Sequence, residues 1–137
     1  MKARLAVVLA VACGLLVGTQ LFAHHGTGIS YDMHKTVTVK GVITKFAFQN
    51  PHSQLYFDVK DDQGNVVNWA LEGGAPNTLS RRGFKRADIK IGDTMIVDGY
   101  VAKDGSHLMD ARRLTLSDGR TFYGGSPGDG GPGDPGK

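Results

Sequence analysis

Residues 55–71 read LYFDVKDDQGNVVNWAL, and their alternation of apolar and polar side chains decides the fold class. A repeat of two residues on both sides of the polar run 61–65 is typical of two half-buried strands joined by a turn, because successive side chains of a strand point to opposite faces. The apolar faces are formed by Leu55, Phe57 and Val59 on the first strand and by Val67, Trp69 and Leu71 on the second. We therefore expect a β-hairpin here.

Upstream of the hairpin, residues 36–48 show the same alternation and predict one long strand. The apolar positions are Val37 and Val39 before Gly41, and Val42, Phe46 and Phe48 after it. A change of phase at a glycine is typical of a β-bulge, which bends a strand and allows it to serve both sides of a small barrel. The run 49–52 is expected to turn the chain into the hairpin.

Downstream, Gly73-Gly74 interrupts the sheet, and Pro76 can open a short helix through Arg82 that Gly83 ends in the left-handed conformation. Further strands are expected over residues 94–100, 108–116 and 121–123. This order of elements predicts an all-β fold with one short helix, most simply a small antiparallel OB-like β-barrel. A two-sheet β-sandwich is the alternative. We expect Met95 in the core and Trp69 at its centre.

The N-terminus has the features of a secretion signal. Lys2 and Arg4 precede an apolar run over 5–17, and Ala23 offers a small residue for cleavage. The apolar run is too short for a bilayer span, and a lipoprotein cut at Cys13 would fall unusually early.

We therefore expect residues 1–23 to be a cleaved signal peptide, 24–29 a leader, 30–123 the folded domain and 124–137 a disordered Gly/Pro-rich tail. The mature protein would be periplasmic or secreted, without stable membrane insertion.

Cleavage changes the composition of the chain. The 16 basic residues fall to 14 once Lys2 and Arg4 are removed, against 13 acidic residues, so the basic excess nearly disappears. The nearly even charge is no argument for nucleic-acid binding, and we expect none. The only cysteine, Cys13, also leaves with the signal, which excludes disulfides and thiolate chemistry from the mature chain.

The most suggestive chemistry follows the cleavage point directly. A mature chain that begins at His24 carries an α-amine and an imidazole on one residue, and these two groups can chelate a metal ion. His25 can add a second imidazole, and His52, presented by the turn at Pro51, is a candidate third ligand. Imidazole ligands and a high place in the divalent affinity order favour Cu(II). A tolerated surface His-His pair is the competing interpretation.

One segment concentrates positive charge. Arg81, Arg82, Lys85 and Arg86 could contact an anionic group or an acidic face of an envelope protein. They could equally be a solvated helix end whose cations suit the helix dipole. No catalytic motif of the common hydrolase, metalloprotease or phosphate-loop types is present, so we expect a protein that is not an enzyme.

Several motifs occur together: the mature start Ala23-His24-His25, the strand over 37–45, the turn Asn50-Pro51-His52, the run from Val66-Val67-Asn68-Trp69 to Pro76-Asn77, and Arg81-Arg82-Gly83. In these residues the sequence resembles a family of short, secreted proteobacterial proteins catalogued as a domain of unknown function. The resemblance covers nearly all of 22–125 and implies an exported, single-domain β protein. Family members often carry an aromatic residue two positions after the histidine of the Asn-Pro-His turn, where this chain has Gln54.

Overall fold

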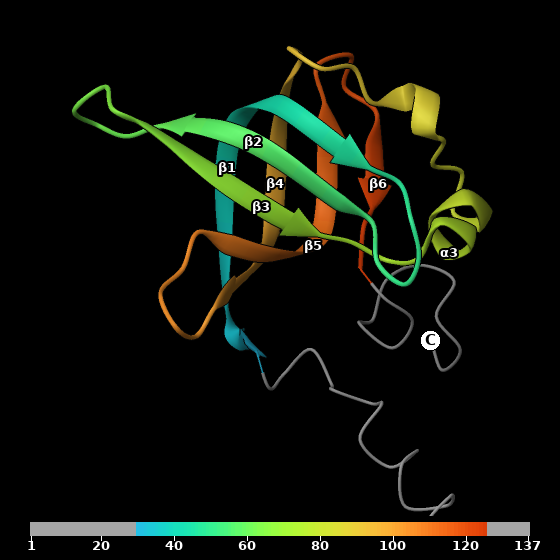
Figure 1. The fold of residues 1–137 in the computed structure, drawn as a ribbon, viewed down its shortest axis with the longest axis horizontal. Helices are drawn as coiled ribbons and strands as arrows, with labels where there is room; N and C mark the ends of the chain where they lie inside the picture. Colours follow the sequence, from blue (N-terminus) through green and yellow to red (C-terminus); the bar gives the residue numbers. More distant parts are fainter. Residues whose placement is uncertain (1–29, 126–137) are drawn as a thin grey trace, which may run out of the picture.

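The computed structural model describes residues 30–125, and it confirms the prediction of an all-β fold with one short helix. The expected strand over 108–116, the short final strand and the helix that begins at Pro76 are all present. The elements are β1 (Tyr31–Ala47), β2 (Gln54–Lys60), β3 (Val66–Glu72), α3 (Pro76–Arg81), the short 3-10 helix η1 (Arg86–Asp88), β4 (Thr94–Ala102), β5 (Leu108–Leu116) and β6 (Thr121–Tyr123) (Figure 1).

The strands form a closed barrel. They follow the order β3-β2-β1-β4-β5-β6 with antiparallel neighbours, and β3 also pairs with β5 in parallel from Ala70–Leu108 to Glu72–Asp110. This last pairing joins the two ends of the sheet, while β6 extends the edge of β5. A three-stranded meander, a helix and a returning pair of strands give the OB-like barrel, and the sandwich alternative does not apply.

Strand β1 bends so that it belongs to both halves of the barrel. It pairs with β4 from Tyr31 to Val42 and with β2 from Val42 to Ala47. The expected bend is present, but its place was predicted wrongly. The register with β2 shifts between Ile43 and Lys45 and not at Gly41. Ile43 therefore still points into the core, with 1% exposure, and Val42 points outward, with 41% exposure.

Gly41 has a different part in this strand. A Cβ atom there would lie 2.5 Å from Cδ2 of Phe57 and 2.7 Å from the carbonyl oxygen of Asp58. The missing side chain therefore permits the close approach of β1 and β2. The alternation of inward and outward side chains continues through Gly41 and breaks only at Thr44.

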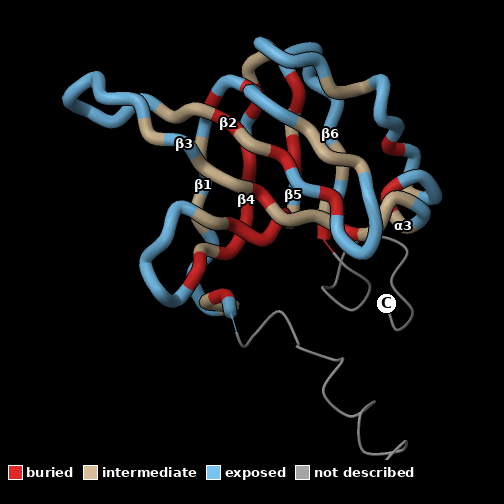
Figure 2. The backbone as a smooth tube through the Cα atoms, viewed as in Figure 1, coloured by how far each residue is buried: buried red, intermediate tan, exposed pale blue. Residues whose placement is uncertain are grey.

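The barrel interior is filled by apolar side chains from every main strand. The most deeply buried are Phe57, Ile43, Met95, Met109 and Val97, which confirms Met95 as a core residue. The prediction that Trp69 lies at the centre of the core is wrong. Trp69 is half-buried and packs against the edge of the core cluster, with its ring centroid 6.4 Å from that of Phe57. Figure 2 shows the buried segments concentrated in β4 and β5 and in the facing parts of β1, β2 and β3.

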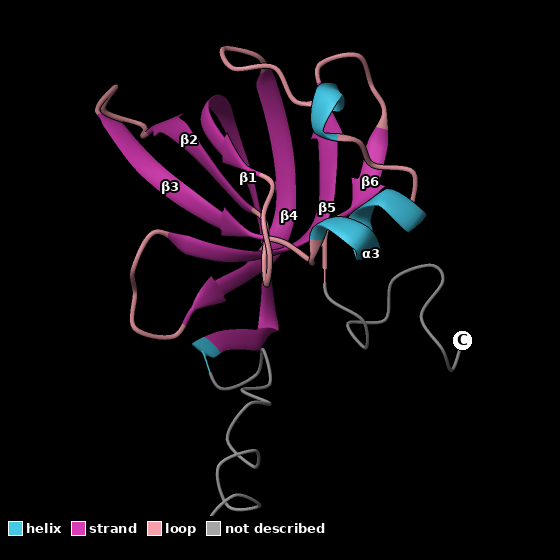
Figure 3. Ribbon diagram, turned by 45° about the vertical axis from the view of Figure 1, so that its right-hand side comes forward, coloured by secondary structure: helices cyan, strands magenta, loops and turns pink. Residues whose placement is uncertain are grey.

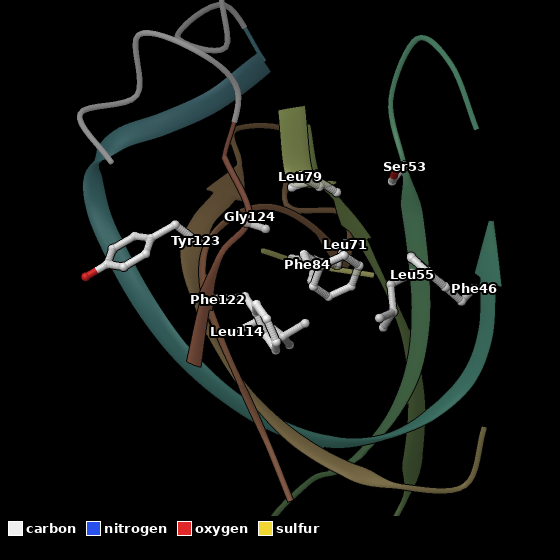
Figure 4. A pocket seen from close by; sticks show the side chains of 12 residues that line it. Phe46, Ser53, Leu55, Leu71, Leu79, Phe84, Leu114, Phe122, Tyr123 and Gly124 are labelled. Carbon is white, nitrogen blue, oxygen red and sulfur yellow. The ribbon is translucent and has the colours of Figure 1, made fainter. Parts of the chain in front are cut away.

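The short helix α3 lies at one end of the barrel, near the ends of β5 and β6 (Figure 3). Its one buried residue, Leu79, packs into the core, and Gly83 ends the turn with a φ of 87° as expected. Beneath the helix, Phe84, Phe122 and their neighbours line a small, partly open cavity of about 30 Å³ (Figure 4). That volume holds no more than a water molecule or two.

A second, smaller cluster lies where the chain enters the barrel. Tyr31 at the start of β1 packs with Tyr100 and Ala102 of β4, and Met33 and Leu108 cover them. The backbone N–H of Lys103 donates to the carbonyl oxygen of Ser30, which fixes the entry point against the β4–β5 turn. The first described residues are therefore held firmly against the barrel.

Candidate functional site

The second cluster adjoins a chain of three polar side chains. Nδ1 of His52, in the loop between β1 and β2, lies 3.0 Å from Oε1 of Glu72 at the end of β3. The other carboxylate oxygen of Glu72 accepts a hydrogen bond of 2.5 Å from the hydroxyl of Tyr31. One carboxylate thus connects the first strand residue of the domain with the histidine of the Asn-Pro-His turn.

Backbone hydrogen bonds hold the loop of His52 against the end of β3. The N–H of Gly73 donates to the carbonyl oxygen of Ser53 at 2.9 Å, and the N–H of Ser53 donates to Gly74 at 3.2 Å. The Gly73-Gly74 pair therefore ends β3 and docks the next loop beside it. Because His52 precedes Ser53 and Glu72 precedes Gly73, the two side chains meet.

Tyr31 is a firmly protonated donor in this arrangement. Its side chain is buried with 4% exposure, and burial raises its pKa far above the ordinary value. The hydrogen bond to Glu72 and the negative charges of Glu72, Asp110 and Asp104 raise the pKa further. The hydroxyl therefore keeps its proton throughout the physiological range and orients the Glu72 carboxylate.

His52 has the features of a metal-binding histidine whose ring is held in place by a carboxylate. Its Nδ1 faces Glu72, which leaves Nε2 as the nitrogen for another partner, and 44% of its side chain is exposed. Metal-bound histidines usually donate the second ring N–H to a carboxylate or carbonyl, which fixes the ring and raises its basicity. Within residues 30–125, however, no three His, Cys, Asp or Glu side chains are grouped to hold a metal ion.

The other histidines of the chain have different positions. His24 and His25 lie outside the described residues. His34 is exposed on β1, where its backbone N–H donates to Asp32, and His107 is exposed in the β4–β5 loop with its ring centroid 5.0 Å from that of Trp69. Of the predicted metal ligands, His52 is the one that the described part of the chain locates.

The basic segment is only partly free. Arg81, Lys85 and Arg86 are exposed around the end of α3, whereas Arg82 is half-buried and donates from Nη1 to the carbonyl oxygen of Gly125 at 2.7 Å. The neighbouring Asp88 accepts the backbone N–H of Lys85 and pairs with Arg120, outside the segment, at 2.6 Å. The four cations therefore do not act as one uniform surface.

Sequence reasoning missed Glu72 and Tyr31 as members of a site. Tyr31 lies in no motif, Glu72 lies inside the run 66–77 but is not one of the residues that define it, and the two are 41 positions apart. The one local signal is an acidic residue directly before the paired glycines. Only the closure of the barrel brings the entry of β1 beside the end of β3.

The described residues include no helix that is long and apolar enough to cross a bilayer.

No curated protein matches the sequence. Among solved structures, a crystal structure of yeast Stn1 and Ten1 is similar with a TM-score of 0.40 and 12% identity, over 59% of this chain. The matched region spans 42% of the length of that structure's chain.

A family model describes most of the sequence. Its match runs over residues 11–109, which includes His24, His25, His52 and Glu72. The match confirms the resemblance to a domain of unknown function that the sequence motifs indicated. The chain therefore belongs to DUF6152, a family of unknown function.

Proposed function

We propose that the mature protein is an exported, non-enzymatic copper-binding protein whose Cu(II) site joins His24, His25 and His52. The observation that carries this proposal is the contact of His52 with Glu72, 3.0 Å between Nδ1 and Oε1, beside the residue where the chain enters the barrel. That contact gives His52 the carboxylate partner that typically orients a metal-binding histidine.

Chain length supports the convergence of the three histidines. His24 lies seven positions before Tyr31, and an extended chain covers at most about 3.6 Å per position, so His24 can lie up to about 25 Å from the start of β1. The Tyr31 hydroxyl and His52 bind the two oxygens of one carboxylate. The leader is therefore long enough to return to His52.

The chemistry of these groups suits Cu(II). His24 supplies an α-amine and a ring nitrogen in one chelate, while His25 and His52 supply imidazoles. An α-amine with a pKa near 8 must lose its proton to bind, so copper affinity should rise with pH through the neutral range. Glu72 acts as a positioning residue for His52, and Tyr31 acts through Glu72.

The test uses the mature chain with a native His24 start, titrated with Cu(II) and followed by calorimetry and electron paramagnetic resonance. His52→Ala should remove one nitrogen from the copper spectrum and weaken binding, and one extra alanine before His24 should remove the amine chelate. His107→Ala is the matched control, because this histidine is also exposed. If His52→Ala and the control give the same spectrum and affinity as the wild type, His52 is not a ligand.

A second function is docking of an envelope protein or polyanion through the segment 81–86. It is supported by the exposure of Arg81, Lys85 and Arg86 around one helix end. Arg86→Glu should lower the salt concentration that elutes the protein from an immobilised polyanion by more than a charge reversal elsewhere does. Lys60→Glu, on the distant end of β2, is the control. Equal elution of both variants would refute this docking surface.

A further inference from the structure

A bulge in β5 turns two neighbouring arginines to the outer face of the barrel. Asp98 of β4 faces Arg113, but the next residue, Gly99, faces Ala111, so Arg112 is the extra residue of the bulge. Ala111 and Leu114 on either side are buried in the core. Successive strand residues normally point to opposite faces, and the bulge is what places both guanidinium groups on the same one.

Each of these guanidinium groups is supported by a tyrosine ring. Arg112 lies over Tyr100 at 5.2 Å from the ring centroid and donates from Nη1 to its hydroxyl. Arg113 lies over Tyr123 of β6 at 6.0 Å. Stacking of this kind orients the planar group while most of its N–H donors stay available for a ligand.

Among the described residues that line the groove beside these arginines, Asp98 is the acidic one, and it is only loosely associated with them. Its Oδ2 lies 3.8 Å from Nη1 of Arg113, which is beyond hydrogen-bonding distance. Its other oxygen accepts a hydrogen bond of 2.6 Å from the hydroxyl of Thr38. The two arginines therefore retain a net positive charge against one carboxylate.

A groove of about 210 Å³ lies between these groups and is lined by Thr36, Asp98, Arg112, Arg113 and Tyr123. The side chain of Tyr123 points away from the cavity beneath α3, whereas Phe122 points into it (Figure 4). The groove is thus on the outer surface, on different residues from the contact between His52 and Glu72.

We infer that this groove binds the phosphate group of an anionic ligand, with Arg112 and Arg113 as the donors. Two preoriented guanidinium groups match the several acceptor oxygens of a phosphate, and each can donate to two of them. Thr36, whose side chain carries a hydroxyl donor, also lines the groove. The phosphate belongs either to a free solute or to a lipid headgroup, and the two sources are distinguished by experiment.

The arginine Nε–H signals of the full mature chain can be followed by NMR during titration with inorganic phosphate at constant ionic strength. Arg112 and Arg113 should shift together and saturate at millimolar phosphate, while the exposed Arg86 should not. Arg113→Gln should weaken binding at least tenfold. Asp98→Asn should strengthen binding severalfold, because it removes a nearby negative charge.

The source of the phosphate is resolved by a second titration with vesicles that contain phosphatidylglycerol. Vesicle binding that Arg113→Gln abolishes assigns the groove to a headgroup, and phosphate binding without vesicle binding assigns it to a free solute. Arg113 is half-exposed, so its replacement leaves the core intact. The inference is overturned if Arg112 and Arg113 shift no more than Arg86, or if Asp98→Asn and Arg113→Gln bind phosphate as the wild type does.

Discussion

The buried tyrosine at the chain entry should make the protein sensitive to alkali, and Tyr31→Phe should remove this sensitivity. In the folded state burial and Glu72 hold the pKa of Tyr31 far above the ordinary value near 10, whereas the unfolded chain ionises near 10. Above pH 10 the unfolded state therefore binds fewer protons than the folded state, and stability falls as pH rises. The loss attributable to Tyr31 is about 1.4 kcal/mol by pH 11, since each pH unit is worth about 1.4 kcal/mol.

At pH 8, by contrast, the same substitution should destabilise the protein by about 1 kcal/mol, because it removes the hydrogen bond to Glu72. The wild type should therefore lose its advantage of about 1 kcal/mol over Tyr31→Phe between pH 8 and pH 11 and become slightly less stable than the variant at pH 11. Urea unfolding followed by the fluorescence of Trp69, the single tryptophan, measures it. Tyr123→Phe is the control, because that ring is 36% exposed. Parallel stability profiles of wild type and Tyr31→Phe over this range would refute the reasoning.

Three further predictions concern other parts of the molecule. Glu72→Gln should lower Cu(II) affinity about 10- to 100-fold in calorimetry, because His52 loses its orienting carboxylate, while Asp62→Asn in the exposed β2–β3 turn should not. Gly41→Ala should lower the free energy of unfolding by about 1–3 kcal/mol, because the added Cβ would clash with Phe57 and Asp58. Thermal unfolding of the variant and the wild type measures this difference. The hydrogen bond from Arg120 holds the pKa of Asp88 below its usual range, so this pair stabilises the fold above pH 4 and loses its effect as pH falls through the lowered pKa. Arg120→Gln should therefore be less stable than wild type at pH 7, and the difference in urea midpoints should shrink as the pH falls through the lowered pKa of Asp88.

Much of the fold could be predicted because the signals are local. The alternation in residues 55–71 and the helix signals at Pro76 and Gly83 each lie within a few residues of the elements they specify. The bend of β1 was misplaced because Val42 and Ile43 are both apolar, so the sequence offers two phases after Gly41. The contact of Gly41 with Phe57 on β2 decides between them, and that contact is not local.

Only part of the candidate site could be predicted from the sequence, because the contacts that form it are also not local. His52 stands out because a proline turn presents it. Glu72 is an acidic residue at the end of a strand, and nothing in the local sequence marks it as part of a site. Tyr31 reads as an ordinary strand residue. Their contact depends on the parallel pairing of β3 with β5, which no periodicity encodes. Trp69 was misplaced because its size suggests the centre of the core, whereas β3 carries it at the rim.

The double pairing of β1 has a consequence for the order in which the protein can fold. The first half of β1 finds its partner only when β4 is available, about 60 residues later, and β3 must wait for β5. A chain that ended after β3 would expose the unpaired edges of both strands, which favours association with other chains. With so many distant contacts the barrel should form in milliseconds to seconds, and only after nearly the whole domain is free to collapse.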